Sequence, residues 1–261
     1  DESALEILEK IQDLIPKYKP IEFATADIMV RLEKFDEARE ILEPKLEENP
    51  DDLRYIKRMV RLLTYDKQYE EAVEYAPRMV ELDPESESTH TLSAMIYEGL
   101  EDQEKAGEHY QKAIDLKPDN KQNWIGYASL LAENLELEKA QELFTKAQEL
   151  DVDSDMVAYA IGTINLFLGK YPEGWNGYEK RDTMNEEIIR TSKPEWKGED
   201  LSGKKLLIIF EQGIGDLVQF VRTIPIIRNY NPEKITLAVP NQSVELLKSF
   251  EGYDELLPFS T

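Results

Sequence analysis

The sequence predicts a mostly α-helical chain, in which a solenoid of repeated helical hairpins is followed by a partial α/β unit. Prolines recur every 34 residues, at Pro16, Pro50, Pro84 and Pro118. A period of this length is typical of helical repeat arrays. After residue 203 the pattern changes to short apolar runs that alternate with helical segments, and the acidic excess falls. A change in both pattern and charge indicates two modules.

Small residues keep the same spacing as the prolines and define the repeats. One such row consists of Ala4, Ala38, Ala72, Ala106, Ala140 and Gly174. Small side chains let two helices approach closely, and each proline ends a second helix because it lacks an amide donor. A hairpin cannot bury its apolar face alone. Neighbouring hairpins are therefore expected to stack into a right-handed solenoid with a concave and a convex side.

The residue types at these positions resemble the tetratricopeptide repeat family. Residues 121–154 match best, with Trp124, Tyr127, Ala128, Ala140, Phe144, Ala147 and Leu150 at the family's positions and Val152 in place of the closing proline. The predicted solenoid covers residues 1–188, as a half repeat at 1–18 and five repeats at 19–52, 53–86, 87–120, 121–154 and 155–188. Because the half repeat has no first helix, the chain is expected to be a fragment that extends further upstream.

Composition and charge exclude several classes of function. The net charge is −23, of which residues 193–261 carry −2 and residues 1–192 carry −21, so nucleic acid and anionic lipid are not expected partners. No apolar run approaches the ~18 residues that a membrane span needs. With no cysteine and two histidines, His90 and His109, neither a metal site nor a cofactor is predicted in this chain. A cytoplasmic location is expected.

A connector at 189–203 is predicted to lead into a partial Rossmann-like βαβαβ unit at 204–261. Strands are expected at 205–210, 235–239 and 256–259, and helices at 217–230 and 242–250. This alternation with short loops predicts a right-handed, doubly wound parallel unit. About 70 residues make half of such a domain at best, so the C-terminus is also expected to be truncated.

Three blocks, at 174–181, 194–199 and 211–222, resemble bacterial proteins in which tetratricopeptide repeats are fused to a GT-B glycosyltransferase. The catalytic half of those proteins is similar to the ADP-heptose lipopolysaccharide heptosyltransferases. The resemblance implies that residues 204–261 are the N-terminal part of a GT-B domain. It also implies a nucleotide-sugar donor for the full-length protein, and transfer with inversion. This fragment alone is expected to be inactive.

The turn after the first predicted strand is the candidate sugar-transfer site. The expected substrate-binding loop consists of Glu211, Gln212, Gly213, Ile214 and Gly215. Ligands of open α/β sheets bind at the carboxyl ends of strands, and glycine amides at a helix N-terminus suit an oxygen-rich ligand. Asp216 would act there as a general base on an acceptor hydroxyl, the role proposed for the matching aspartate of the heptosyltransferases. The alternative is that Asp216 is only a helix N-cap.

The same turn does not fit a dinucleotide site. Gly213 and Gly215 supply two glycines of that fingerprint, but Val218 occupies the place of the third. No acidic residue closes the second predicted strand. Nicotinamide binding is therefore not expected.

A second candidate site lies on the solenoid. Arg54, Lys57, Arg58 and Arg61, called here the cationic face, share one side of a helix that the repeat family turns toward the concave groove. Such a cluster could bind acidic side chains or a terminal carboxylate of a partner protein or peptide. The alternative is that neighbouring acids neutralise it.

Two functions follow from these sites. In the first, the chain is a glycosyltransferase fragment whose repeats recognise an acceptor or partner protein and whose α/β part supplies the acceptor side of a transfer site. In the second, it is a non-catalytic protein–protein interaction scaffold with an α/β cap. Whether the protein is an enzyme is left open by the sequence.

Overall fold

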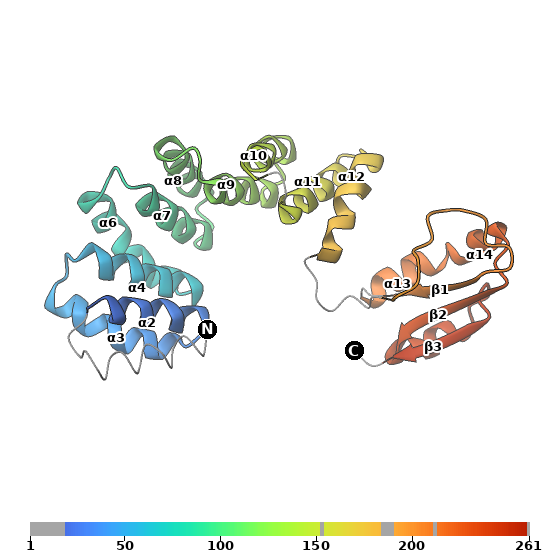
Figure 1. The fold of residues 1–261 in the computed structure, drawn as a ribbon. Helices are drawn as coiled ribbons and strands as arrows, with labels where there is room; N and C mark the ends of the chain where they lie inside the picture. Colours follow the sequence, from blue (N-terminus) through green and yellow to red (C-terminus); the bar gives the residue numbers. More distant parts are fainter. Residues whose placement is uncertain (1–18, 152–153, 184–190, 211–212, 260–261) are drawn as a thin grey trace. The chain divides into compact units, whose positions relative to one another are not determined.

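A computed structural model describes residues 19–151, 154–183, 191–210 and 213–259. The chain divides into two compact units, residues 1–184 and 185–261 (Figure 1). The predicted half repeat at 1–18 lies outside the described residues. Among those that are described, every helix is too short or too polar to cross a membrane.

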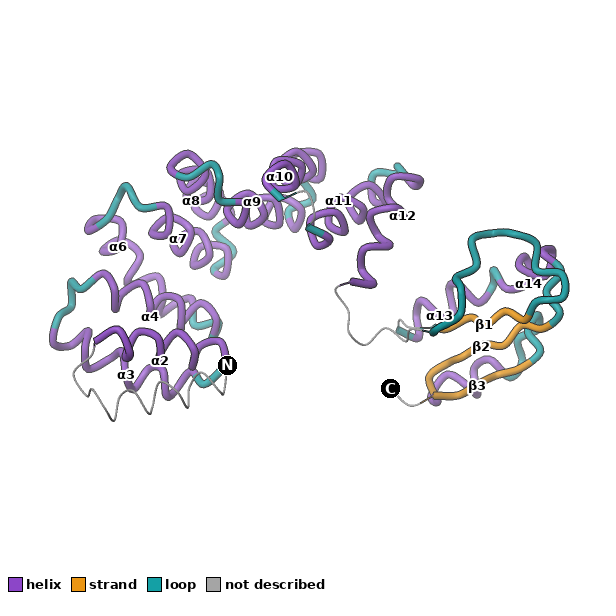
Figure 2. Tube along the Cα trace, in the orientation of Figure 1, coloured by secondary structure: helices purple, strands orange, loops and turns teal. Residues whose placement is uncertain are grey.

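The first unit consists of helical hairpins, one in each predicted repeat (Figures 1 and 2). Four of them are α2 (Lys19–Arg31) with α3 (Phe35–Glu48), α7 (Glu87–Gly99) with α8 (Gln103–Leu116), α9 (Lys121–Glu133) with α10 (Leu137–Leu150), and α11 (Asp155–Phe167) with α12 (Tyr171–Tyr178), which η2 (Glu179–Thr183) extends. In the remaining one, α4 (Leu53–Tyr65) pairs with α5 (Tyr69–Ala72), η1 (Val73–Tyr75) and α6 (Ala76–Leu82).

Prolines shape the second helices in two ways. Where Pro50, Pro84 and Pro118 close a repeat, the helix ends two residues earlier, as the sequence predicts. The break between α5 and α6 was not expected from the repeat pattern. Pro77 explains it, because it has no amide hydrogen for the carbonyl of Val73 and its ring crowds that carbonyl.

Each first helix ends in the same turn, and the turn recurs every 34 residues. In the first repeat the amide of Lys34 donates to the carbonyl of Met29 (2.9 Å), and that of Glu33 donates to Val30 (3.1 Å). These two bonds define a Schellman motif, which requires one residue in the left-handed region. The left-handed residues are Glu33, Lys67, Glu101, Leu135 and Gly169, with φ of 58°, 59°, 59°, 61° and 75°. Only the last of them is glycine.

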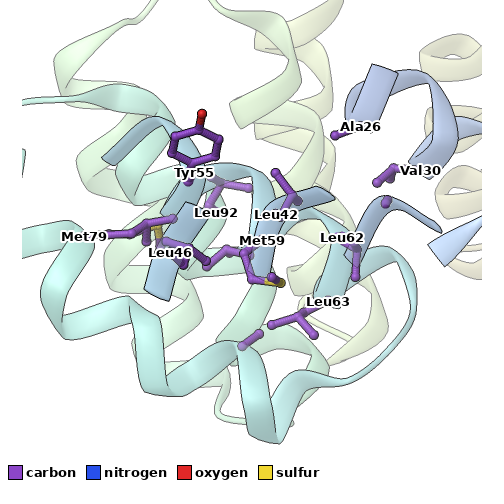
Figure 3. Packing of buried hydrophobic residues seen from close by; sticks show 14 of the residues in the cluster. Ala26, Val30, Leu42, Leu46, Tyr55, Met59, Leu62, Leu63, Met79 and Leu92 are labelled. Atoms are coloured by element: carbon purple, nitrogen blue, oxygen red, sulfur yellow. The ribbon is translucent and has the colours of Figure 1, made fainter. Parts of the chain in front are cut away.

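The core of the first unit lies where the small residues let helices meet (Figure 3). Ala38, Ala72, Ala106 and Ala140 are completely buried. Larger side chains such as Leu42, Met59 and Leu63 fill the space around Ala38 and Ala72. The helices α11 and α12 approach each other closely, since a Cβ added to Gly162 would lie 2.6 Å from the Gly177 backbone.

The second unit is a three-stranded parallel sheet with short helices. The strands are β1 (Lys205–Ile209), β2 (Lys234–Pro240) and β3 (Glu255–Phe259), in the order β1-β2-β3. Leu206 pairs with Ile235, and Leu237 with Leu256. The three strands lie close to their predicted positions.

The two helices of this unit differ from the prediction, because each is broken into shorter pieces. The helix predicted over 217–230 is three pieces, α13 (Ile214–Val221), α14 (Ile224–Ile227) and η3 (Arg228–Tyr230), and the one predicted over 242–250 is η4 (Asn241–Ser243) and α15 (Val244–Leu247). Both crossovers of the described sheet step in the same direction, as they do within one half of a doubly wound sheet, and the Rossmann-like assignment stays a prediction. Leu217 of α13 and Leu247 of α15 join the cluster of Ile235, Leu237 and Val239, so both helices cover one face.

Part of the predicted connector packs on the second unit. Leu201 is 3% exposed, and its amide donates to the carbonyl of Tyr230 (2.7 Å). The ring of Trp196 meets that of Tyr230 edge-on, with 4.9 Å between the centroids. The connector therefore contributes to the fold of the α/β unit from about these residues onward.

His90 and His109 form a hydrogen-bonded pair between α7 and α8. Nε2 of His90 lies 2.9 Å from the carbonyl of Pro84, which only accepts, so Nε2 carries the hydrogen. In the neutral ring Nδ1 is then an acceptor, and Nδ1–H of His109 donates to it at 2.9 Å. One repeat later Trp124 occupies the position of His90 and donates to Pro118 (2.8 Å). The pair is a structural element of the repeat.

The environment of His109 favours its neutral form. Burial lowers the pKa of His109 to about 4, and the neighbouring His90 and Lys112 contribute to the lowering. The ring of Tyr97 stacks on it at 5.5 Å and covers one face of the imidazole. Protonation of His109 would put a charge into this packed site.

We predict that exchanging Lys67 for glycine stabilises the solenoid. Lys67 is exposed and holds a left-handed conformation that costs a non-glycine residue ~1–2 kcal/mol, partly offset by the greater chain entropy of glycine. The Lys67→Gly variant should gain about 0.5–1 kcal/mol in the free energy of unfolding, measured by urea denaturation. The control Lys67→Ala should change little. A Gly variant less stable than the Ala variant would contradict the prediction.

Stability should also fall with pH below the ordinary pKa of histidine. Because the folded pKa of His109 lies below 6.5, the unfolded chain takes up the proton first, and stability present above pH 6.5 is lost as the pH falls toward 4. After a discount for partial exposure, His109 should contribute about 1 kcal/mol to the loss between roughly pH 7 and pH 5. His109→Gln should remove that part of the loss. If the free energy of unfolding depends on pH in the same way in both proteins, His109 does not contribute to the loss.

Candidate binding groove

The first helices of successive repeats line a groove, here called the N-terminal groove, with a volume of about 1120 Å³. Its walls come mainly from α2, α4 and α7 and include Asp27, Arg61, Tyr65, Glu87, Met95 and Glu98. Tyr65 is exposed there, although tyrosine has a large apolar ring. The wall thus combines acids, two arginines and apolar groups, as a peptide-binding surface does.

The four cations of the cationic face lie together, beside a small depression of about 260 Å³. Each of them has an acidic neighbour. The ion pairs are Arg54 with Asp52 (2.6 Å), Lys57 with Asp83 (3.2 Å), Arg58 with Asp27 (3.1 Å) and Arg61 with Asp27 (3.9 Å). Neighbouring acids thus pair with the cationic face, as the alternative interpretation expects. A role of these cations in partner binding stays a prediction.

The four cations are not equivalent. The guanidinium of Arg58 lies 4.2 Å from the centroid of the Phe23 ring and also donates to Asp27, so it links α4 to α2. Arg61 makes the longest of the four ion pairs and is half-exposed. A partner carboxylate could exchange with Asp27 at Arg61 at small cost, whereas displacing Arg58 would disturb the contact between repeats.

The candidate sugar-transfer turn is only partly within the described residues, since Glu211 and Gln212 lie outside them. Gly213 is the N-cap of α13, and Asp216 is the third residue of the helix. The amide of Asp216 donates to the carbonyl of Gly213 (3.1 Å). The expectation that Asp216 is the N-cap is therefore wrong. It lies in the first helical turn, where the negative charge of a carboxylate interacts favourably with the helix dipole.

The glycines of this turn are not required by the packing of the described residues. A Cβ on Gly213 or Gly215 would meet no atom within 4 Å, and neither residue has a positive φ. Ile214 between them is exposed. The turn lies just beyond the carboxyl end of β1 and is open to solvent, so it has space for a ligand. The described residues hold no group of three or more acidic or histidine side chains placed to bind a metal ion.

A further groove, not expected from the sequence, lies between α9, α10 and α11. This C-terminal groove has a volume of about 380 Å³ and includes Ile125, Leu135, Phe144, Met156, Tyr159 and Phe167. A comparison of the same positions in successive repeats could have found it. Where α4 has Lys57 and Arg61, α9 has Ile125 and Ser129, and α11 has Tyr159 and Thr163.

Comparisons with known proteins agree with the repeats. A model of the tetratricopeptide repeat family matches residues 88–120. Protein FlbA of Caulobacter vibrioides is 38% identical over 101 residues, which is 37% of this chain and 17% of that protein. The chain therefore matches only a small part of that relative.

Several solved structures share the fold of the repeats. Yeast Tom70 superposes with a TM-score of 0.59 at 17% identity, over 71% of this chain and 40% of that one. A thermophilic tetratricopeptide protein of Thermus thermophilus gives 0.54 at 19% identity, over 61% and 87%. A tetratricopeptide repeat protein from Parabacteroides merdae gives 0.56 at 16% identity, over 70% and 73%. Residues 88–120 thus match the tetratricopeptide repeat family, and the hairpins with their 34-residue turns share the fold of these solved structures.

Proposed function

We propose that this chain is a protein–protein interaction scaffold that holds a peptide segment of a partner along its first helices. The observation that carries the proposal is the row of grooves on these helices, which bear exposed large side chains that the core does not use. In a solenoid each hairpin contacts only its neighbours, so the first helices share an extended surface along the stack.

The N-terminal groove suits a peptide better than a small rigid ligand. It is open, and its polar groups are spread along three helices rather than converging on one point. Arg61 and Tyr65, one turn apart on α4, place a cation and an aromatic ring side by side. An acidic side chain or a terminal carboxylate could bind Arg61 while an apolar neighbour packs on Tyr65.

We expect random short peptides displayed on phage to be enriched on the immobilised chain, including peptides with acidic residues. Arg61→Glu should weaken the binding of the acidic peptides by ~10-fold, because it reverses the charge of the side chain that they contact. The matched control is Lys146→Glu, which reverses an equally exposed cation on α10. Both variants should melt like the unchanged protein. If acidic peptides bind the Arg61→Glu variant as tightly as the unchanged protein, Arg61 does not contribute to peptide binding.

Sugar transfer is the second candidate, and the open glycine turn favours it. Gly213 and Gly215 follow the carboxyl end of a parallel strand. Neither the backbone conformation nor the packing of the described residues requires glycine at these positions. Backbone amides freed of side chains could approach a sugar or phosphate oxygen, and Asp216 lies within the same turn. This hypothesis keeps the repeats as the part that positions an acceptor.

The two roles of Asp216 can be separated in a longer protein that contains this chain and transfers a sugar. Asp216→Asn should lower kcat by ~10²- to 10⁴-fold with melting unchanged if the carboxylate is a general base. If the carboxylate only interacts with the helix dipole, kcat should stay near normal and the free energy of unfolding should fall by at most ~1 kcal/mol. Glu245→Gln, in the first turn of α15, is the control. Full activity of Asp216→Asn excludes the base role.

A further inference from the structure

The C-terminal groove is apolar where the N-terminal groove is charged. Among the described residues that line it, Glu133 is the one that carries a charge. Ile125, Phe144 and Ile164 form its floor and walls together with Tyr159. This part of the first-helix surface therefore favours apolar side chains, and polar groups of a partner would lose hydration there without replacement hydrogen bonds.

Three large apolar side chains at this groove are left in water. Leu135 is 75% exposed, Phe167 is 73% exposed and Met156 is 47% exposed. Leu135 also holds the left-handed position of its turn, where a leucine is costly and a glycine would be relaxed. A single exposed apolar residue needs no explanation, but a group that lines one groove is typical of an interaction site.

Two carboxylates lie near each other on the first-helix surface, since Glu133 lines the C-terminal groove and Glu98 lines the N-terminal groove. Glu98 accepts a hydrogen bond from the Tyr110 hydroxyl (2.6 Å), and burial raises the pKa of Glu98, as does the nearby charge of Glu133. Within the part of the chain that the structure describes, neither carboxylate has a basic side chain at ion-pair distance. The contrast with the cationic face is clear, since every cation there is paired.

We infer that the C-terminal groove binds a peptide segment with two or more large apolar side chains next to a lysine or arginine. The apolar side chains would cover Phe167, Met156 and Leu135, and the cation would pair with Glu133 and Glu98. This inference rests on the proposed scaffold function and specifies the partner for one part of the surface.

Other occupants fit less well. An acidic segment would bring like charge to two carboxylates that already repel each other. A wholly apolar segment would leave Glu98, already half-buried, deeper in a low-dielectric site without a partner. A basic residue at that place supplies the missing counter-charge and can also donate hydrogen bonds to both carboxylates.

The test is a selection of random short displayed peptides on the immobilised chain, followed by binding measurements on the enriched sequences. We expect a class of peptides that pairs large apolar residues with a lysine or arginine. Phe167→Ser should weaken the binding of these peptides by ~10-fold, because an exposed aromatic side chain that anchors them is lost. Glu133→Lys should weaken it by a similar factor and should leave peptides that depend on Arg61 unchanged.

Two matched variants control for surface changes elsewhere. Tyr171→Ser removes an exposed aromatic residue of α12 outside the groove, and Glu138→Lys reverses an exposed acid of α10. Neither should affect the apolar–basic peptides. If peptides are enriched but lack this pattern, or bind Phe167→Ser and Glu133→Lys normally, the inference fails and the scaffold function stands. If no peptide is enriched over an unrelated acidic protein, both fail.

Discussion

The close approach of helices at small residues is the constraint on which the solenoid depends. Ala38, Ala72, Ala106 and Ala140 have no exposed surface, and at Gly162 the helix backbones are so near that a methyl group would not fit. The same Schellman turn joins the two helices of each hairpin, even where Glu33, Lys67 or Glu101 must take a left-handed conformation. Because each repeat contacts only its neighbours, the shared turn and the buried small residues set the surface of the described solenoid.

A fixed core leaves the exposed side of the first helices free to vary. Along that side the chain changes from the cations of α4, through the carboxylates Glu87 and Glu98 of α7, to the apolar groups of α9 and α11. The backbone is nearly the same in each case, so the differences in chemistry come from side chains that the core does not restrain. A segment that binds one part would for that reason be a poor ligand for another.

The sequence predicts the repeats well because a 34-residue period reports local packing, which is repeated in every hairpin. It predicts less where contacts link distant positions. The ion pairs of Arg58 and Lys57 are with Asp27 and Asp83 in neighbouring hairpins, and only stacking makes them neighbours. In the α/β unit, strand order depends on how helices dock on the sheet. The break before Ile224 is local, because Pro225 has no amide hydrogen for the carbonyl of Val221, and the expectation of one continuous helix there was wrong.

The separation between core and groove also makes the binding hypotheses accessible to mutation. Phe167, Leu135 and Arg61 lie on the exposed side, so changing them should alter recognition while the packed rows of alanines stay intact. Arg58 is the exception, because its guanidinium stacks on Phe23 and binds Asp27. A loss of peptide binding in an Arg58 variant would report the contact between two repeats as much as the groove. Of these two arginines, only Arg61 can test the cationic face without disturbing the solenoid that presents it.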